Sequence, residues 1–359
     1  MPVSVNAEIL SIPLQKGLCM SKVNIKQIAE IAGVSPSAVS LVLNDRKGVG
    51  VKTRKRILQV ISDLNYTPNA HSRKLILQRS FNIFLVLHDD TAVLENTFYT
   101  AILRSVVQKA SELGYDVILS LASRSPADSS IYKAIEQKNL DGILFLRDIR
   151  SDLRHHLQSR DIPFVVIDSH RTPPGYPCVR SDYELSAFEA VQYLISMGHR
   201  KVGLIGMGII PEFYLASFNG FKRAMEETRL DIRLNWIQSE AYDEESAYAC
   251  MEKILRSDVL PTAIYCSGDL LAIGAMRCAA DSGYSVPDDF SFCGLDDIPL
   301  SRYCSPPLTT ICVDKVQMGE LAVMLLDKMI RRQEDVSEIV TVRSSEIRVR
   351  GSVRDVLIQ

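Results

Sequence analysis

The chain has 359 residues, of which 47% are hydrophobic and 23% are charged. It is too long for one compact core and too apolar for disorder, so two or three packed units are expected. The formal net charge of −2 hides an uneven distribution. Between Ser21 and Ser80 eleven basic residues accompany three acidic ones, a charge of +8 that leaves −10 for the remainder. This segment is therefore suited to a polyanion such as nucleic acid.

The eight cysteines contain no Cys-x-x-Cys pair, and most lie within apolar runs. Buried, reduced thiols of a cytosolic protein are therefore expected rather than a disulfide or zinc framework. No run of about 20 apolar residues occurs, so no membrane span is predicted. Residues 1–21 are predicted to be a disordered extension. Alternatively, residues 1–19 are upstream sequence before a true start at Met20.

Residues 22–66 are predicted to form a small all-α domain of three short helices, because apolar residues recur at helical spacing in each. Residues 67–80 are polar and basic, open with Pro68 and form a linker. From Phe81 onward short apolar strands alternate with amphipathic helices, which predicts parallel sheets with helices on both faces, arranged in two α/β lobes. We predict strands at 83–87, 117–121, 142–146, 164–168, 202–206, 263–267 and 290–295. We predict helices at 101–113, 185–197, 218–228, 246–256, 270–282 and 315–331.

The segment from Asn24 to Ser40 carries the most specific signal. Asn24 can cap a first helix, and Gly33 can supply the backbone of a tight turn. Ser35 can cap a second helix, with Pro36 in its first turn, where a missing amide hydrogen costs nothing. This pattern is typical of a helix-turn-helix whose second helix enters the major groove. The alternative is an amphipathic helical bundle with a solvated basic face, which the turn residues and the charge distribution disfavour.

On these residues the chain resembles the lactose and galactose repressor family of bacterial transcription regulators, from about Asn24 to Ser352. The resemblance implies that Pro36, Ser37 and Leu41 face the bases and that Ser40 and Asn44 contact or position the DNA backbone. Relatives often carry a polar or basic residue where this chain has Leu41, which can offer only apolar contact, for example to a thymine methyl. The full predicted DNA-binding set is Asn24, Ser35, Pro36, Ser37, Ser40, Leu41, Asn44, Gly50, Thr53, Arg54, Asn69, Arg73 and Leu75.

Two further parts of that set have their own rationale. Gly50, Thr53 and Arg54 lie at the start of the third helix, whose amides and cations suit phosphate. The segment from Tyr66 to Leu75 resembles the family's hinge helix, which is expected to form when two copies pair over DNA, with Leu75 as an apolar wedge in the minor groove. The alternative is a flexible linker with an incidental leucine.

Several core motifs also resemble this family. They are Gly198 to Gly206, Pro261 to Ile264, Gly268 to Ala275, Phe292 to Asp297 and Pro307 to Ile311. The family's core is similar to periplasmic sugar-binding proteins, in which two lobes close on a ligand. The resemblance implies a core at 81–359, with one lobe at about 81–180 and 315–338 and the other at about 181–311 and 339–355. Crossings between the lobes are expected near Arg180, Ile311 to Lys315 and Ser337 to Thr341.

The resemblance also implies an effector site between the lobes, where strand ends of α/β folds place ligands. The candidates carried over by position are Phe98, Asp168, Ser181, Ser217, Tyr242, Asp269 and Asp296. Asp296 can accept two hydroxyl hydrogen bonds, and the Tyr242 ring can stack on a sugar or base. Each has a structural alternative: Asp168 and Asp269 as helix caps or lobe-bridging partners, and Tyr242 as a surface aromatic. Ser217 stands where many relatives carry an arginine that contacts the effector.

Catalytic interpretations are weaker. Gly206-Met207-Gly208 begins a dinucleotide fingerprint, but Pro211 stands where its third glycine belongs. The six histidines do not cluster at metal-ligand spacing. A transport-type solute receptor would use the same lobes, but it leaves the basic segment unexplained, and no export signal is evident. The sequence therefore predicts a cytoplasmic, homodimeric repressor without enzyme activity, metal or cofactor. It should bind a pseudo-palindromic operator and a sugar or nucleoside-like effector.

Overall fold

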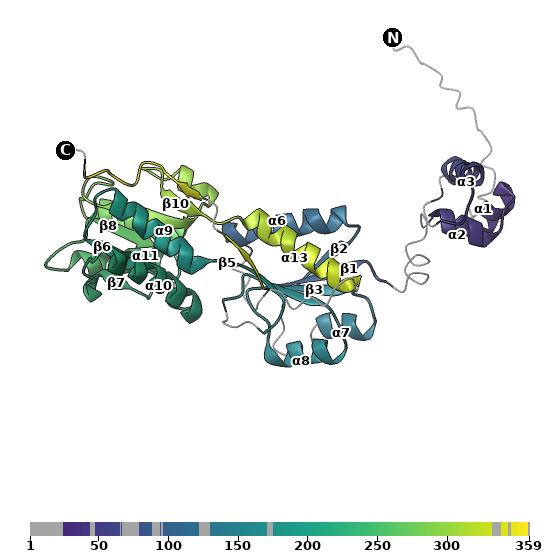
Figure 1. Ribbon diagram of the computed structural model, residues 1–359, viewed down its shortest axis with the longest axis horizontal. Helices are drawn as coiled ribbons and strands as arrows, with labels where there is room; N and C mark the ends of the chain where they lie inside the picture. The colour runs from purple at the N-terminus through teal and green to yellow at the C-terminus, as the bar shows by residue number, and fades with distance from the viewer. Residues whose placement is uncertain are drawn as a thin grey trace, which may run out of the picture. The chain divides into compact units, whose positions relative to one another are not determined.

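The computed structural model describes residues 24–43, 47–64, 66, 79–87, 94, 96–121, 130–170, 175–331, 339–343 and 346–357 (Figure 1). The chain divides into two compact units, Met1–Gln78 and Arg79–Gln359. Among the described residues, the first unit contains helices only, and the second contains two largely parallel sheets with helices on both faces. The predicted fold class is confirmed.

The first unit is a three-helix headpiece of α1 (Ile25–Ala32), α2 (Pro36–Leu43) and α3 (Val51–Asp63). Its core is small because the helices are short. The buried residues are Ile28, Ala29, Ala32, Val39, Val42 and Ile57. Alanines at two of these positions let α1 approach its neighbours closely. The headpiece surface also exposes the apolar residues Ile31, Val51 and Leu58.

The first sheet of the second unit has the order β11-β5-β4-β3-β1-β2, with all neighbours parallel. Its strands are β1 (Asn82–Leu87), β2 (Asp116–Leu121), β3 (Gly142–Leu146), β4 (Phe164–Ile167), β5 (Cys178–Ser181) and β11 (Ile339–Val342). Alternate residues of β1, β3 and β4 pack on opposite faces. Helices α6 (Thr97–Glu112) and α13 (Lys315–Ile330) cover one face, and α7 (Ser130–Glu136) and α8 (Ser151–Ser159) cover the other (Figure 1).

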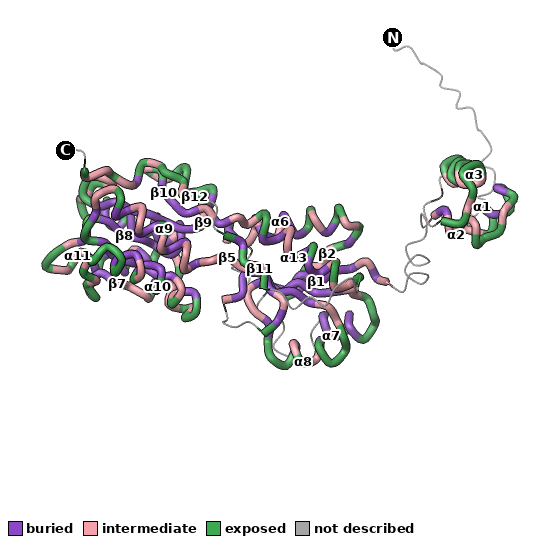
Figure 2. The backbone as a smooth tube through the Cα atoms, viewed as in Figure 1, coloured by how far each residue is buried: buried purple, intermediate pink, exposed green. Residues whose placement is uncertain are grey.

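The second sheet has the order β12-β10-β9-β8-β6-β7, with only β12 antiparallel. Its strands are β6 (Val202–Ile205), β7 (Ile237–Gln238), β8 (Ala263–Cys266), β9 (Ser291–Asp296), β10 (Thr309–Cys312) and β12 (Glu346–Arg348). Helices α9 (Tyr183–Ser196) and α10 (Pro211–Glu227) cover one face, and α11 (Glu244–Leu255) and α12 (Asp269–Asp281) cover the other. The short helices η2 (Leu234–Trp236) and η3 (Pro299–Arg302) lie in connections. The central strands of both sheets are buried (Figure 2).

Each predicted strand coincides with an observed one, but β5, β7 and β10 to β12 were not predicted because they are short and lie in connections or at sheet edges. One lobe assignment was wrong. Residues 339–342 were expected in the second lobe, yet β11 pairs with β5 in the first sheet. β11 pairs with the free edge of β5 and so becomes the sixth parallel strand of the first sheet. The chain therefore makes its third crossing between the lobes after Val342. Helix α10 begins at Pro211, seven residues before the predicted start.

Candidate functional site

Helix α1 is closed at both ends by hydrogen bonds that its sequence encodes. The Asn24 side chain accepts from the Gln27 amide at 3.0 Å, and the Gln27 side chain accepts from the Asn24 amide at 2.9 Å. This reciprocal pair is a capping box. Gly33 ends the helix at φ +62°, in the left-handed region that favours glycine. The predicted cap and glycine turn are confirmed.

Helix α2 begins with the residues predicted to read DNA bases. The Ser35 hydroxyl accepts from the Ala38 amide at 3.2 Å, and Pro36 occupies the first helical position, as the sequence predicted. Ser35, Pro36 and Ser37 are exposed. Because the opposite side of α2 packs in the headpiece core, the exposed start of the helix is fixed in direction and is available to a partner.

The later residues of the predicted base-reading face are less exposed. Ser40 and Leu41 are half-buried, and a methyl group of Leu41 lies close to Gly48. Part of the Leu41 side chain is therefore packed inside the headpiece. The predicted DNA-binding residues Asn44, Asn69, Arg73 and Leu75 lie outside the described residues.

Helix α3 presents an uncapped N-terminus. Gly50 makes no side-chain cap, and the first turn contains no acidic residue. The free amides at this end keep the partial positive charge of a helix N-terminus. Thr53 and Arg54 are half-buried in this turn, and Lys52 is exposed. The arrangement has the chemistry that phosphate binding needs, which is the role predicted for Gly50, Thr53 and Arg54.

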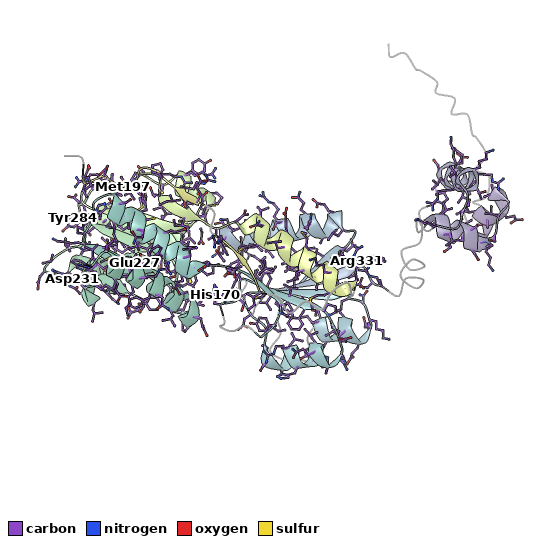
Figure 3. All side chains as sticks on the ribbon, viewed as in Figure 1. His170, Met197, Glu227, Asp231, Tyr284 and Arg331 are labelled. Atoms are coloured by element: carbon purple, nitrogen blue, oxygen red, sulfur yellow. The ribbon has the colours of Figure 1, made fainter. Side chains whose placement is uncertain are left out.

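In the second unit, Asp168 directly follows β4 and lies in a buried polar cluster. It accepts a hydrogen bond from the Tyr99 hydroxyl at 2.9 Å and another from the Tyr183 hydroxyl. His170, labelled in Figure 3, has its Nε2 atom 3.6 Å from the same carboxylate. The centre of its ring lies 5.4 Å from that of Tyr183 and 5.1 Å from that of Phe213. Tyr99 comes from α6 on the first sheet, whereas Tyr183 and Phe213 come from α9 and α10 on the second. Asp168 thus bridges the two lobes.

The protonation of this cluster follows from its burial. Burial raises the pKa of Tyr99 and of Tyr183 well above the ordinary value, and the charge of Asp168 adds to both shifts. Burial also lowers the pKa of His170, although Asp168 opposes that shift. The tyrosines are therefore neutral donors to an acceptor carboxylate, and the imidazole is neutral near pH 7.

Asp296 ends β9 on the second sheet with φ +114° and is half-buried. The Lys315 ammonium donates to its backbone carbonyl and lies 5.7 Å from the centre of the Phe98 ring. Within the described ranges, no group donates a hydrogen bond to the Asp296 carboxylate itself. Burial, with the charge of Asp269, raises the pKa of Asp296 well above its usual range. Its carboxyl oxygens therefore remain available to the donors of a polar partner.

Asp269 is accounted for by the protein itself. Its buried carboxylate accepts from the Ile298 amide at 2.8 Å, the Ser301 hydroxyl at 2.6 Å and the Thr310 hydroxyl at 2.5 Å. A side chain added at Gly294 would lie 2.3 Å from one of its oxygens, so the backbone of β9 packs directly on the carboxylate. Burial raises the pKa of Asp269 to about 6 despite these donors. Asp269 thus joins α12 to η3 and β10 within the second lobe, a structural role that is neither the helix cap nor the lobe-bridging partner expected as its alternatives.

Two predicted effector residues have unsatisfied hydroxyls. Ser181, at the end of β5, and Ser217, within α10, are both buried, and neither hydroxyl has a hydrogen-bond partner among the described residues. The same holds for the buried Tyr265 hydroxyl of β8 within that part of the chain. Burial raises the pKa of Tyr265 and the Ser217 hydroxyl opposes that shift, so these two hydroxyls lie close to each other. Buried polar atoms without partners are uncommon and indicate a ligand or water position.

Tyr242 differs from the other candidates because it is 55% exposed. It follows β7, and its amide donates to the Ser246 hydroxyl at 2.9 Å at the start of α11. The backbone there is fixed while the ring faces solvent. The structure thus brings Phe98 close to Lys315 and Asp296, surrounds Asp168 and Asp269 with protein donors, and leaves Tyr242 exposed.

Sequence reasoning missed Tyr99, Tyr183, His170, Arg147 and Lys315. Three signals were available. Tyr99 adjoins the predicted Phe98, Lys315 lies in a predicted crossing between the lobes, and Arg147 directly follows β3, which was predicted as a strand. The positions of Tyr183 and His170 depend on which strand and helix ends come together, so spacing along the chain could not reveal them.

The two units therefore define a class of protein: a helix-turn-helix headpiece joined to a two-lobed α/β core with polar strand ends. Residues 24–69 match the model of bacterial regulatory proteins of the lacI family, and residues 191–353 match a periplasmic binding protein-like domain. The chain is 32% identical over 333 residues to the HTH-type transcriptional repressor PurR of Histophilus somni strain 129Pt, with 92% of this chain and 98% of that protein covered. The chain belongs to the LacI family of transcription regulators and is not an enzyme.

Other similarities agree with this assignment. PurR of Haemophilus influenzae strain PittEE is 32% identical over 339 residues, with 93% of this chain and 99% of that protein covered. The lac repressor dimer bound to operator and the anti-inducer ONPF shares the fold with a TM-score of 0.75 at 23% identity, with 93% and 100% covered. The structure of the transcriptional regulator CelR in complex with cellobiose has a TM-score of 0.68 at 24% identity. The match covers 92% of this chain and 99% of that chain. Among the described residues, no helix is long and apolar enough to cross a membrane.

Proposed function

We propose that this regulator is a cytoplasmic homodimer that represses transcription from a pseudo-palindromic operator, and that a small polar effector bound at the strand ends of its two lobes controls the affinity for that operator. The observation that carries the proposal is the combination of a helix-turn-helix, capped at both ends of α1 and at the start of α2, with two lobes in which polar groups are unsatisfied among the described residues. The first supplies DNA recognition, and the second supplies a reason for a ligand.

The headpiece supports the DNA half of the proposal. The predicted base-reading residues Pro36 and Ser37 are exposed at the start of a helix capped by Ser35, and the uncapped start of α3 offers amides and the Arg54 cation for phosphate. The PurR relatives are named as repressors, and the lac repressor structure holds operator DNA as a dimer. A two-fold dimer presents two headpieces, which is why we propose a pseudo-palindromic site of about 16–20 base pairs.

The core supports the effector half. Asp296 lacks a hydrogen-bond donor within the described chain, and the Ser181 and Ser217 hydroxyls are buried and unpaired. A ligand rich in hydroxyl or amide groups would satisfy such atoms, and the CelR structure holds cellobiose on the same fold. A sugar or nucleoside-like molecule with a flat apolar face would also suit the exposed Tyr242 ring.

Dimerisation and location have their own support. Strand β2 is an edge of the first sheet, and its Leu119 and Leu121 are 50% and 48% exposed. Val107 on the adjacent α6 is 51% exposed, which gives this edge an apolar surface that a second copy could cover. All cysteines in the described ranges are free thiols, in keeping with a reducing compartment.

Selection of operator sequences from genomic DNA, followed by footprinting, tests the DNA half. We expect protection of two symmetric half-sites. Arg54→Ala should weaken binding to operator and random DNA alike and reduce the salt slope by about one. Leu75→Ala should weaken operator binding only, because the wedge adds no charge. A single protected half-site bound by a monomer would refute the dimer, and equal losses for Leu75→Ala on both DNAs would refute the wedge.

Calorimetry tests the effector half, using the metabolite that most changes operator affinity. Asp296→Ala and Tyr242→Ala should each weaken its binding, whereas the exposed Asp258→Ala on the same lobe serves as the control and should not. If both site variants keep wild-type affinity and DNA response, the effector binds elsewhere.

A further inference from the structure

Arg147 and Asp168 lie side by side where two strands of the first sheet end. Strands β3 and β4 pair in parallel with Leu146 opposite Ile167, so the next residue of each strand is Arg147 or Asp168. The Arg147 amide donates to the Ile167 carbonyl at 2.7 Å, which fixes this register. Both residues have positive φ, +74° and +61°. Such conformations are uncommon outside glycine and concentrate at functional sites.

The guanidinium of Arg147 forms no ion pair in the described part of the chain. The carboxylate of its neighbour Asp168 ends the adjacent strand, but it accepts its hydrogen bonds from Tyr99 and Tyr183 and not from Arg147. Neither an ion pair nor a hydrogen bond from the Arg147 side chain forms with any described residue. A half-buried cation without a partner is unfavourable unless solvent or a ligand compensates it.

The charge of Arg147 reaches the candidate effector site. Burial lowers the pKa of His170, and the positive charge of Arg147 lowers it further, so that charge lies near the cluster that bridges the lobes. Asp296, from the second sheet, forms no ion pair with Arg147 among the described residues. Among the described residues, the polar groups left for a ligand include the Arg147 guanidinium, the Asp296 carboxyl group and the Ser181 and Ser217 hydroxyls.

We propose that the effector carries an anionic group, a carboxylate or a phosphate, and that Arg147 binds it. Arginine presents a planar fork of donors that matches either group with two parallel hydrogen bonds. The hydroxyl-bearing remainder of the ligand would meet Asp296, Ser181 and Ser217. This inference rests on the proposed function and names the class of effector.

The test is calorimetry on the full chain, without DNA, over a panel of matched neutral and acidic compounds. The panel holds glucose, glucuronate and glucose 6-phosphate, ribose and ribose 5-phosphate, and inosine and its 5′-monophosphate. We expect at least one acidic member to bind at least about 10-fold more tightly than its neutral counterpart, and Arg147→Gln to weaken that binding by about 10- to 100-fold. The comparison of glucuronate with glucose 6-phosphate distinguishes carboxylate from phosphate.

Two variants sharpen the result. Arg147→Lys keeps the charge but loses the planar fork, so it should retain part of the affinity. Arg104→Gln removes an exposed arginine of α6 on the same lobe and should have no effect. Tighter or equal binding of the neutral compounds, no binding by any acidic member, or a preference that survives Arg147→Gln would each overturn the inference. A wild-type protein that binds operator and answers to a neutral compound would keep the proposed function while rejecting the anionic effector.

Discussion

Substitution of Asp269 by asparagine should make the protein less dependent on pH without breaking its second lobe. The carboxylate is buried, and its pKa is raised to about 6 from an ordinary value of 3.8. A folded-state pKa above the unfolded value means that the folded protein binds the proton more tightly. The resulting stabilisation is complete below the unfolded pKa and is lost as the pH rises through about 6.

The magnitude follows from the two pKa values. A separation of about 2 units corresponds to about 3 kcal/mol between the acid and alkaline limits. Between pH 7.5 and pH 5 this one group should add about 1.4 kcal/mol to the free energy of unfolding. In Asp269→Asn that increment should vanish. The asparagine oxygen can still accept from the Ile298 amide and the Ser301 hydroxyl, while its amide donates to the Thr310 hydroxyl, which can act as acceptor.

Urea unfolding of both proteins at pH 5, 6, 7 and 7.5 measures the effect. We expect the variant to be at least as stable as the wild type at pH 7.5 and to lose that advantage by pH 5. Asp289→Asn, in an exposed turn of the same lobe, is the control and should leave the pH profile unchanged. Parallel profiles for wild type and Asp269→Asn would show that the carboxylate is already ionised at pH 5. A loss above about 3 kcal/mol at pH 7.5 would show that the amide cannot replace its hydrogen bonds.

The remaining predictions concern helix packing and capping. Gly319→Ala should lower the free energy of unfolding by about 1–3 kcal/mol, because the added carbon would lie 1.9 Å from the Ser105 hydroxyl oxygen. Urea unfolding measures this loss, and unchanged stability would mean that α6 and α13 can move apart to make room for the added carbon. Tyr115→Phe should lower the free energy of unfolding by about 1–3 kcal/mol in the same assay, because the Tyr115 hydroxyl donates to the Asp327 carboxylate at 2.7 Å. Unchanged stability would show that water replaces this donor to Asp327. Asn24→Ala should destabilise α1 by about 0.5–2 kcal/mol, seen as faster amide exchange in that helix of the full chain, and unchanged exchange would deny the cap its role.

The parts of the fold that could be predicted are those whose information is local. The central strands are buried on both faces and appear as unbroken apolar runs, as in β1 and β3. The caps of the headpiece could be read from Asn24, Gly33 and Ser35, since each acts on residues three or four positions away. The start of α10 could not be located, because its first two turns carry exposed apolar residues such as Leu215 that obscure the helical period.

In the candidate effector site, too, only the features that depend on local sequence could be predicted. Asp168 and Asp296 were found because each directly follows an apolar strand. Their surroundings were not, because Tyr99 is 69 residues from the carboxylate that it contacts. Which carboxylates are satisfied by protein donors depends on such distant contacts. The sequence could therefore propose Asp269 and Asp296 on equal terms, while the structure gives three donors to the first and none within the described chain to the second.

The threading of the chain through two lobes has a consequence for synthesis on the ribosome. The first sheet starts at Asn82 but takes α13 and β11 from residues 315–342, after the second lobe has been made. Until α13 emerges, the face of the sheet that includes Leu144 and Val165 lacks one of its two covering helices. The second lobe, by contrast, needs only the short β12 and the chain just after it from beyond that point. The lobe nearer the N-terminus is therefore expected to finish folding late, and its nascent form should be the one that binds chaperones.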